Sequence, residues 1–349
     1  MTIVLRYGRQ QLFRYRVGDI NVLGRLHGAT PVRRADWRLN GAAAQSFYVE
    51  AAPNISLLPT PDGFVATPID WRYQYKLSPA ALRLWELGDF NIEIPSESPA
   101  LCRGRNQLVI EIEDRWKEIH RAELELSWDP SPLPLPLDLS DLSAFEDIQA
   151  LGQIVDGGFE LDSEANVVRS LTPVAPDNLL VLGSPAASQE ATYRIRFHDV
   201  AAGKYVGLSD FFVAHEADEP PIGIKPGWST AGMATIRSNG EARSWIAWGD
   251  NSHGPNVWIV ATEPPALFRP EDDIDYRVRH QIRIADGKNS TRFRIWKETE
   301  EEPATWLCAE DDVAVDRSLP RHERASFALF QHTGVGSEWS DIRIVGLES

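Results

Sequence analysis

The sequence predicts an all-β protein made of two antiparallel β-sandwich domains. Short alternating runs rich in Val, Ile, Phe, Tyr and Trp recur from end to end, separated by Gly, Pro, Asn and Asp, and this spacing is typical of antiparallel sandwiches. Helical periodicity is nearly absent. Short helices are expected only at 79–87 and 139–153, the second beginning at Asp141 or Ser143. The length of 349 residues fits about two domains.

A proline-rich stretch marks the boundary between the two domains. Prolines at 130, 132, 134 and 136 remove ladder donors and favour an extended connector. We therefore assign residues 1–128 to the first sandwich, 129–140 to the connector and 141–349 to the second sandwich. Strands are expected at 20–26, 36–40, 88–94 and 106–112 in the first sandwich, and at 192–198, 207–215, 233–237, 244–248, 257–261, 276–284, 291–296, 326–330 and 339–345 in the second.

Charge and composition exclude several classes of function. The chain has 51 acidic and 35 basic residues, a net charge of −16, which argues against nucleic acid or an anionic membrane as the partner. No apolar stretch is long enough for a membrane helix. Two cysteines without CxxC spacing give no zinc motif. Arginines fill the N-terminal stretch where a secretion signal needs apolar residues, so we expect a cytoplasmic protein, or a secreted one if this is a mature form.

The C-terminal part resembles a known sandwich family. Its successive segments 276–284, 293–297, 302–306, 326–330 and 339–344 look like the closing strands of concanavalin A-like lectin/glucanase domains of the laminin G kind. The segments 7–8, 21–25, 39–41 and 88–94 are similar to an immunoglobulin-like sandwich. The resemblance implies a concanavalin A-like jelly roll at the C-terminal end, with a ligand lying across its concave sheet or against the loops at its rim.

One departure from that family changes the expected cleft. Where the relatives carry an Arg-Trp pair shortly before a His on a central strand, this chain has Phe211 and Phe212 followed by His215. An apolar residue in place of the arginine predicts a cleft that is less suited to sugars.

Aromatic and titratable residues of the second domain are the candidates for a site. The stretch 244–253 contains Trp245, Trp248, Asp250 and His253, and rings are bound by such mixtures of indoles and polar groups. The opposite interpretation is that one tryptophan is core and Asp250 belongs to a turn. The candidate catalytic residues are His215, Asp250 and His332; the candidate ligand-binding residues are Phe211, Trp228, Trp245, Trp248, His253, Arg237 and Trp296.

Three other groups of residues are assigned a predicted role or position. Lyase chemistry would use His215, Arg237, Tyr276, His280 and His332, although no local motif links them. The row formed by Arg277, Arg279, Gln281 and Arg283 is expected to be a solvated face. No cofactor is expected, with calcium as the one candidate ion, at the acidic loops 216–219 or 271–275.

Three functions follow as hypotheses. The first is a carbohydrate-binding or glycan-processing protein with an aromatic groove in the second sandwich. The second is an intracellular enzyme of small-molecule metabolism, a cyclase or isomerase, with an apolar aromatic pocket and His/Asp proton-transfer groups. The third is a non-catalytic interaction module with a flat apolar surface. The expected partner is thus an oligosaccharide or another small molecule, and the sequence leaves the oligomeric state open.

Overall fold

The protein is all-β. The computed structural model describes residues 1–15, 19–28, 32–47, 49, 55–60, 63–68, 87–171, 177–202, 205–214, 229–248, 258–285, 288–311, 323–332 and 336–348. In this part of the chain the only helical elements are two single 3₁₀ turns, η2 (Ile148–Ala150) and η3 (Val200–Ala202). No helix of the described residues has the length and apolarity to cross a lipid bilayer.

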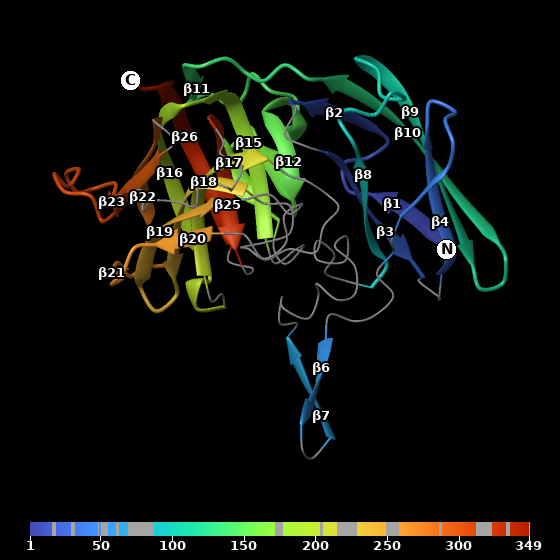
Figure 1. Ribbon diagram of the computed structural model, residues 1–349, viewed down its shortest axis with the longest axis horizontal. Helices are drawn as coiled ribbons and strands as arrows, with labels where there is room; N and C mark the ends of the chain where they lie inside the picture. The colour runs from blue at the N-terminus through green and yellow to red at the C-terminus, as the bar shows by residue number, and fades with distance from the viewer. Residues whose placement is uncertain are drawn as a thin grey trace.

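The first sandwich is built from residues 2–129. One sheet has the order β1 (Thr2–Leu5), β3 (Ile20–His27) and β8 (Asp89–Ile94). The other has the order β2 (Gln10–Arg14), β10 (Ile119–Asp129), β9 (Gly104–Asp114), β4 (Val32–Leu39) and β5 (Gln45–Ser46). β1 and β2 follow one another in the chain but lie in different sheets, and β2 meets β10 in the parallel direction. A separate two-stranded ladder joins β6 (Ile55–Thr60) to β7 (Gly63–Pro68) and projects from the rest of the protein (Figure 1).

The second sandwich is larger and consists of two eight-stranded sheets. The first sheet contains β13 (Phe159–Asp162), β14 (Val167–Ser170), β26 (Gly336–Gly346), β16 (Ser188–His198), β22 (Asp275–Ala285), β23 (Lys288–Lys297) and β24 (Cys308–Asp311), with β11 (Leu137–Leu139) paired to β26. The second contains β12 (Gly152–Asp156), β15 (Asp177–Ala186), β25 (Ala325–His332), β17 (Tyr205–Ala214), β18 (Ser229–Arg237), β19 (Glu241–Trp248) and β20 (Trp258–Ala261), with β21 (Ala266–Leu267) paired to β19. We name this second one the β17 sheet.

Each sandwich encloses its own core. Burial alternates along the strands, as in β16, where every second residue is buried, because successive side chains of a strand point to opposite faces. The first core contains Val22, Ile92 and Ile110; the second contains Tyr193, Phe327 and Trp339. The alternation that predicted the strands therefore also places the apolar side chains that form the two cores.

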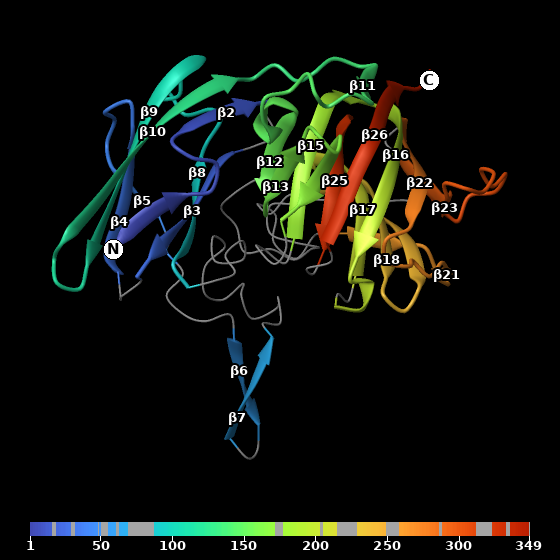
Figure 2. The same ribbon diagram turned by 180° about the vertical axis from the view of Figure 1, so that it is seen from behind.

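A third apolar cluster joins the two sandwiches. Tyr15, at the end of β2, packs with Val155, Leu179 and Phe330 of the β17 sheet, and its hydroxyl lies 2.6 Å from the Ser326 hydroxyl. Beside it, Arg6 donates to the Gly157 carbonyl, the Tyr7 hydroxyl accepts from the Phe159 amide, and Gln153 donates to the Asp19 carbonyl. The two sandwiches consequently lie side by side, with β12 facing β2 and β3 (Figure 2).

The predicted strands of the second sandwich all overlap observed ones. The segment 276–284 lies inside β22, and 339–345 lies inside β26. β12 to β15 were not predicted. The all-β prediction and the sandwich architecture are confirmed, whereas the immunoglobulin-like and concanavalin A-like types and the exact domain limits stay predictions.

The helix expected at 139–153 is wrong. The stretch starts as β11, continues as an irregular segment, makes the single turn η2 and enters β12. The side chains of Asp138 and Asp141 each accept a hydrogen bond from the backbone amide two residues ahead, and such local bonds compete with helix formation. The same bond from Gln149 to Asp147 caps the single turn η2. The helix expected at 79–87 lies almost entirely outside the described residues.

Candidate functional site

Several of the candidate site residues lie where the structure gives no side-chain description. His215, Trp228, Asp250 and His253 are outside the described residues. The backbone of His332 ends β25 and pairs with Asp177, and that of Trp248 ends β19 and pairs with Trp258. The roles proposed for these six residues stay predictions.

Phe211 lies in the core of the second sandwich. Its side chain is fully buried, with ring centroids 4.6 Å from His280 and 5.7 Å from Phe327. A ligand on the opposite face of the β17 sheet would not touch it, so the expectation that Phe211 lines an aromatic cleft gains no support from its position. The aromatic residue on that opposite face is its neighbour Phe212.

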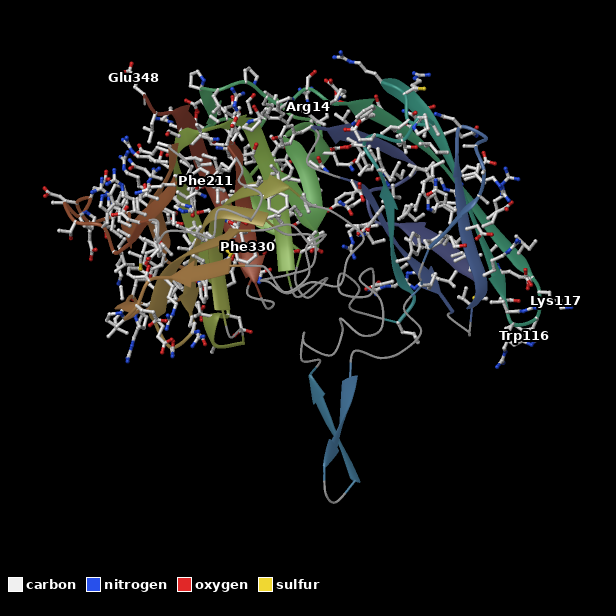
Figure 3. All side chains as sticks on the ribbon, viewed as in Figure 1. Arg14, Trp116, Lys117, Phe211, Phe330 and Glu348 are labelled. Atoms are coloured by element: carbon white, nitrogen blue, oxygen red, sulfur yellow. The ribbon has the colours of Figure 1, made fainter. Side chains whose placement is uncertain are left out.

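The face of the β17 sheet that points away from the main core is the best candidate site, and we name it the outer face. Its apolar floor consists of Val155, Leu179, Val181, Phe212, Met233, Ala328 and Phe330, joined by Tyr15 of the first sandwich. Figure 3 labels Phe330, on this face, and Phe211, on the core side. All side chains of the floor, Tyr15 included, are buried, and both sandwiches contribute to the cluster that they form.

A row of side chains crosses the outer face on five adjacent strands. The register places Ala328 of β25 opposite Val181 of β15 and Asp210 of β17, and Met233 of β18 opposite both Asp210 and Trp245 of β19. Neighbouring strands are about 4.8 Å apart, so Asp210 and Trp245 are separated by roughly 10 Å. Val181, Ala328, Asp210 and Met233 are buried, so Trp245 is the member of the row that a ligand can reach.

Trp245 is the predicted site residue that the structure places on this row. It is partly buried against the apolar floor. Its indole N–H donates to the Thr235 hydroxyl at 2.7 Å, and the Arg243 guanidinium carbon lies 5.9 Å from the ring centroid. A hydrogen bond and a cation–π contact together fix the orientation of the indole. Contacts within the chain therefore fix the orientation of the Trp245 ring.

Asp210 is the unusual member of the row. It is fully buried, its Oδ1 accepts a hydrogen bond from the Thr230 hydroxyl, and no hydrogen-bond partner of its Oδ2 lies among the described residues. Burial raises the pKa of this carboxyl to about 8, and the bond from Thr230 offsets only part of the rise. At neutral pH the Asp210 carboxyl therefore keeps its proton and the row carries no charge.

The other candidates lie apart from this row. Arg237 ends β18 and pairs with Glu241 at 2.9 Å, and Trp296 is a partly buried residue of β23 in the other sheet. Tyr276 is buried, and its hydroxyl accepts the Glu271 amide at 2.9 Å. Among the described residues named for lyase chemistry, Arg237 and Tyr276 therefore have separate partners.

His280 belongs to a buried polar chain between the two sheets. Tyr193 donates to the Ser209 hydroxyl at 2.8 Å, which lies 2.8 Å from His280 Nδ1, while Nε2 lies 2.9 Å from the Thr291 hydroxyl. Burial lowers the pKa of His280 to about 3, so the imidazole is neutral. With both nitrogens bonded inside the core, His280 has a structural role.

The acidic loop at 271–275 does not gather its carboxylates. Glu271 pairs with Lys297, Asp273 with His198 and Asp275 with Arg196, while Asp272 accepts the Val200 amide. Each carboxylate is used by a different partner, which does not favour calcium there. The loop at 216–219 lies outside the described residues.

A polar hollow of about 440 Å³ lies on the first sandwich. It is lined by Asn40, Arg105, Asn106, Gln107, Glu123, Leu124 and Glu125. The amide of Asn40 donates to Asn106 at 2.8 Å, and its oxygen accepts the Gln107 amide at 2.8 Å. These hydrogen bonds hold the turn before β9 in place. Because the lining of the hollow includes no aromatic ring, we favour the outer face over the hollow as the candidate ligand site.

The sequence interpretation missed Asp210, Thr230 and Tyr15 as members of this surface. A signal for Asp210 exists, since it is a lone acid in the otherwise apolar run of β17. No local signal identifies Tyr15, because it comes from the other sandwich.

Comparisons with known proteins place the chain in no family. No family model matches it, and neither does any curated protein. Among solved structures, it is similar to a carbohydrate-binding module, CBM66 from Bacillus subtilis, with 8% identity, a TM-score of 0.37 and coverage of 56% of this chain and 97% of that one.

Two further structures match more of this chain. A bifunctional GH43-CE protein of Bacteroides eggerthii has 11% identity and a TM-score of 0.36 over 97% of this chain. The secreted serine protease VesC from Vibrio cholerae has 7% identity and a TM-score of 0.19 over 98%. The chain spans about half the length of each, 51% and 50% respectively. At these scores no function is transferred.

Proposed function

We propose that this protein binds a neutral carbohydrate on the outer face of the β17 sheet, with Trp245 as the stacking platform. The observation that carries the proposal is the indole of Trp245, partly exposed and held by Thr235 and Arg243 at the side of an apolar floor. A fixed aromatic ring next to a few polar groups is how proteins commonly orient ring-shaped ligands.

The charge of the surroundings favours a neutral ligand. The chain carries a net charge of −16, which disfavours anionic ligands. The Asp210 carboxyl keeps its proton at neutral pH and adds no charge of its own to the row. A neutral sugar ring offers both the C–H face that stacks on an indole and hydroxyl groups for the rim.

The alternative, an enzyme acting on an apolar small molecule, draws on the same surface. The floor around Phe212, Met233 and Phe330 is apolar, and Asp210 is a neutral acid within it. Proton transfer from a buried acid with a raised pKa is a known catalytic arrangement. The choice between the two functions thus depends on which ligand class occupies the outer face.

The test is a thermal-shift and calorimetric screen against two panels, neutral gluco-, galacto-, manno- and xylo-oligosaccharides and apolar polycyclic compounds. We expect stabilisation by at least one oligosaccharide, because a ligand at about 100 times its Kd adds roughly 2.7 kcal/mol. Trp245→Ala should weaken that binding roughly tenfold or more, whereas Trp245→Phe should retain part of it.

The matched control is Trp306→Ala. The guanidinium carbons of Arg292 and Arg294, both on β23 of the other sheet, each lie 4.5 Å from the centroid of the Trp306 ring. Its loss should leave sugar binding unchanged. Stabilisation by apolar compounds alone would replace the carbohydrate proposal with the enzyme alternative, and equal losses in both tryptophan variants would remove the outer face as the site.

A further inference from the structure

The hairpin formed by β9 and β10 has a tightly fixed turn. β9 ends at Asp114 and β10 starts at Ile119. The Asp114 amide donates to the Glu118 carbonyl, and the Lys117 amide donates to the Asp114 carbonyl, both at 3.0 Å. Figure 3 shows Trp116 and Lys117 at the tip, at the end of the first sandwich farthest from the second. The hairpin is thus well separated from the outer face.

Asp114 is held in one orientation at the base of this turn. Asp114 is only 2% exposed, and its Oδ1 accepts hydrogen bonds from the backbone amides of Trp116 at 2.8 Å and Glu118 at 2.9 Å. These two bonds fix the carboxylate plane. The second oxygen, Oδ2, points to Nε2 of His120, whose side chain is 10% exposed.

The contact between Asp114 and His120 is loose for an ion pair. The distance from Oδ2 to Nε2 is 3.3 Å, whereas charge-assisted N–H···O bonds are about 2.7–2.9 Å long. Two ligands of one tetrahedral metal, each about 2.1 Å from it, are roughly 3.4 Å apart. The observed separation therefore matches a pair of metal ligands better than a direct ion pair.

Glu118 completes the set. A carboxylate oxygen of Glu118, one of Asp114 and a ring nitrogen of His120 all lie within 4.8 Å of one another. Among the described residues, no other group of three His, Cys, Asp or Glu side chains converges in this way. Glu118 is exposed, so its carboxylate can close over an ion without rearranging the core.

We propose that Asp114, Glu118 and His120 bind a divalent transition-metal ion of the zinc class. One imidazole with two carboxylates suits zinc, and also cobalt, nickel and copper, whereas calcium requires six or more oxygen ligands. Two carboxylates balance the charge of the ion. Three protein ligands leave a fourth position for water.

The experiment uses the full, untagged chain after removal of metals with EDTA. Calorimetric titration with ZnCl₂ should give one site per chain, and titration with CoCl₂ should produce the visible absorption bands of a low-symmetry cobalt site. His120→Gln and Glu118→Gln each should abolish the cobalt bands and weaken zinc binding roughly tenfold or more. Both variants keep a polar side chain of similar size, and both side chains lie at the tip of a hairpin, so the fold is retained.

The matched control is His27→Gln, which removes an exposed imidazole at the end of β3. It should bind zinc like the parent protein. The proposal is overturned if the parent chain takes up no zinc, or if the hairpin variants bind it as tightly as His27→Gln does, since the ion would then lie elsewhere on the acidic surface. None of these outcomes depends on sugar binding.

Discussion

At the scale of single residues, Asp210 combines complete burial with a carboxyl oxygen that has no hydrogen-bond partner in the part of the chain that the structure describes. Its pKa is about 8 in the folded protein against a usual value of 3.8. In the unfolded chain the group ionises near its usual pKa, so the folded state retains a proton that the unfolded state has released. The stabilisation from Asp210 is present below pH 3.8 and is lost as the pH rises through about 8.

Asp210→Asn should remove this dependence on pH. The amide oxygen can still accept from Thr230, and the amide never ionises. The free energy of unfolding of the variant should therefore rise relative to that of the parent as the pH rises through this window, by up to about 1.4 kcal/mol per pH unit. Urea unfolding curves at several pH values measure the difference.

The control for this prediction is Asp141→Asn. Ser143 hydrogen bonds lower the pKa of the exposed Asp141 carboxyl, so its contribution is lost only as the pH falls through the acid range. Above about pH 5 the difference between this variant and the parent should not change with pH. A pH-independent difference for Asp210→Asn as well would mean that Asp210 ionises normally in the folded protein.

At the scale of elements, two glycines with positive φ distinguish two ways in which a substitution by alanine destabilises the fold. One is backbone strain, and the other is a steric clash of the added Cβ. Gly88 has φ +88° and precedes β8, and a Cβ there would collide with the Leu26 carbonyl oxygen. Gly8 has φ +75°, and a Cβ added there would meet no atom within 4 Å. Both positions disfavour an L side chain, but only Gly88 also lacks space.

Gly88→Ala should therefore destabilise the protein more than Gly8→Ala. We expect a loss of about 1 kcal/mol for Gly8→Ala, from backbone strain alone, and of roughly 2–5 kcal/mol for Gly88→Ala, because β8 must shift away from β3. Urea unfolding at constant pH measures both. Equal losses would show that the contact between Gly88 and Leu26 adjusts freely.

At the scale of the whole molecule, the two sandwiches share an interface that centres on Tyr15. Its ring packs on the β17 sheet, its hydroxyl meets Ser326, and the bonds of Arg6 and Tyr7 lie in the same region. Burial raises the pKa of Tyr15 to about 12, so the hydroxyl stays protonated at neutral pH. We expect these contacts to couple the stability of the two cores.

Tyr15→Ala should weaken this coupling. We expect the loss of a buried aromatic ring to lower the free energy of unfolding by about 3–5 kcal/mol, and to separate the calorimetric unfolding of the two sandwiches. Tyr15→Phe removes only the hydroxyl and should cost about 1–2 kcal/mol. A Tyr15→Ala profile that superimposes on the parent profile would mean that the sandwiches are not coupled through this residue.

The sequence by itself determined the all-β class, most of the long strands of the second sandwich from β16 onward and the place of Trp245 on a strand. These follow from local alternation, because the side chains of a strand point to its two faces in turn. The row from Arg277 to Arg283 was predicted to be solvated, which holds for its three arginines: Arg277 and Arg279 are partly exposed and paired with acidic side chains, and Arg283 is exposed. Gln281, in the same row, is buried, and there the prediction is wrong.

Only the tertiary structure decided which residues meet. Alternation places the side chains of Phe211 and Asp210 on opposite sides of their strand. It does not say which of the two side chains points into the core. The row from Val181 to Trp245 depends on the register of five strands, and Tyr15 reaches the outer face from the other sandwich. The failed helix at 139–153 shares this origin at its first residue, Leu139, which belongs to β11 and pairs with β26 over a long range. Long-range pairing and register depend on the packing of the whole chain, and no local pattern of residues encodes them.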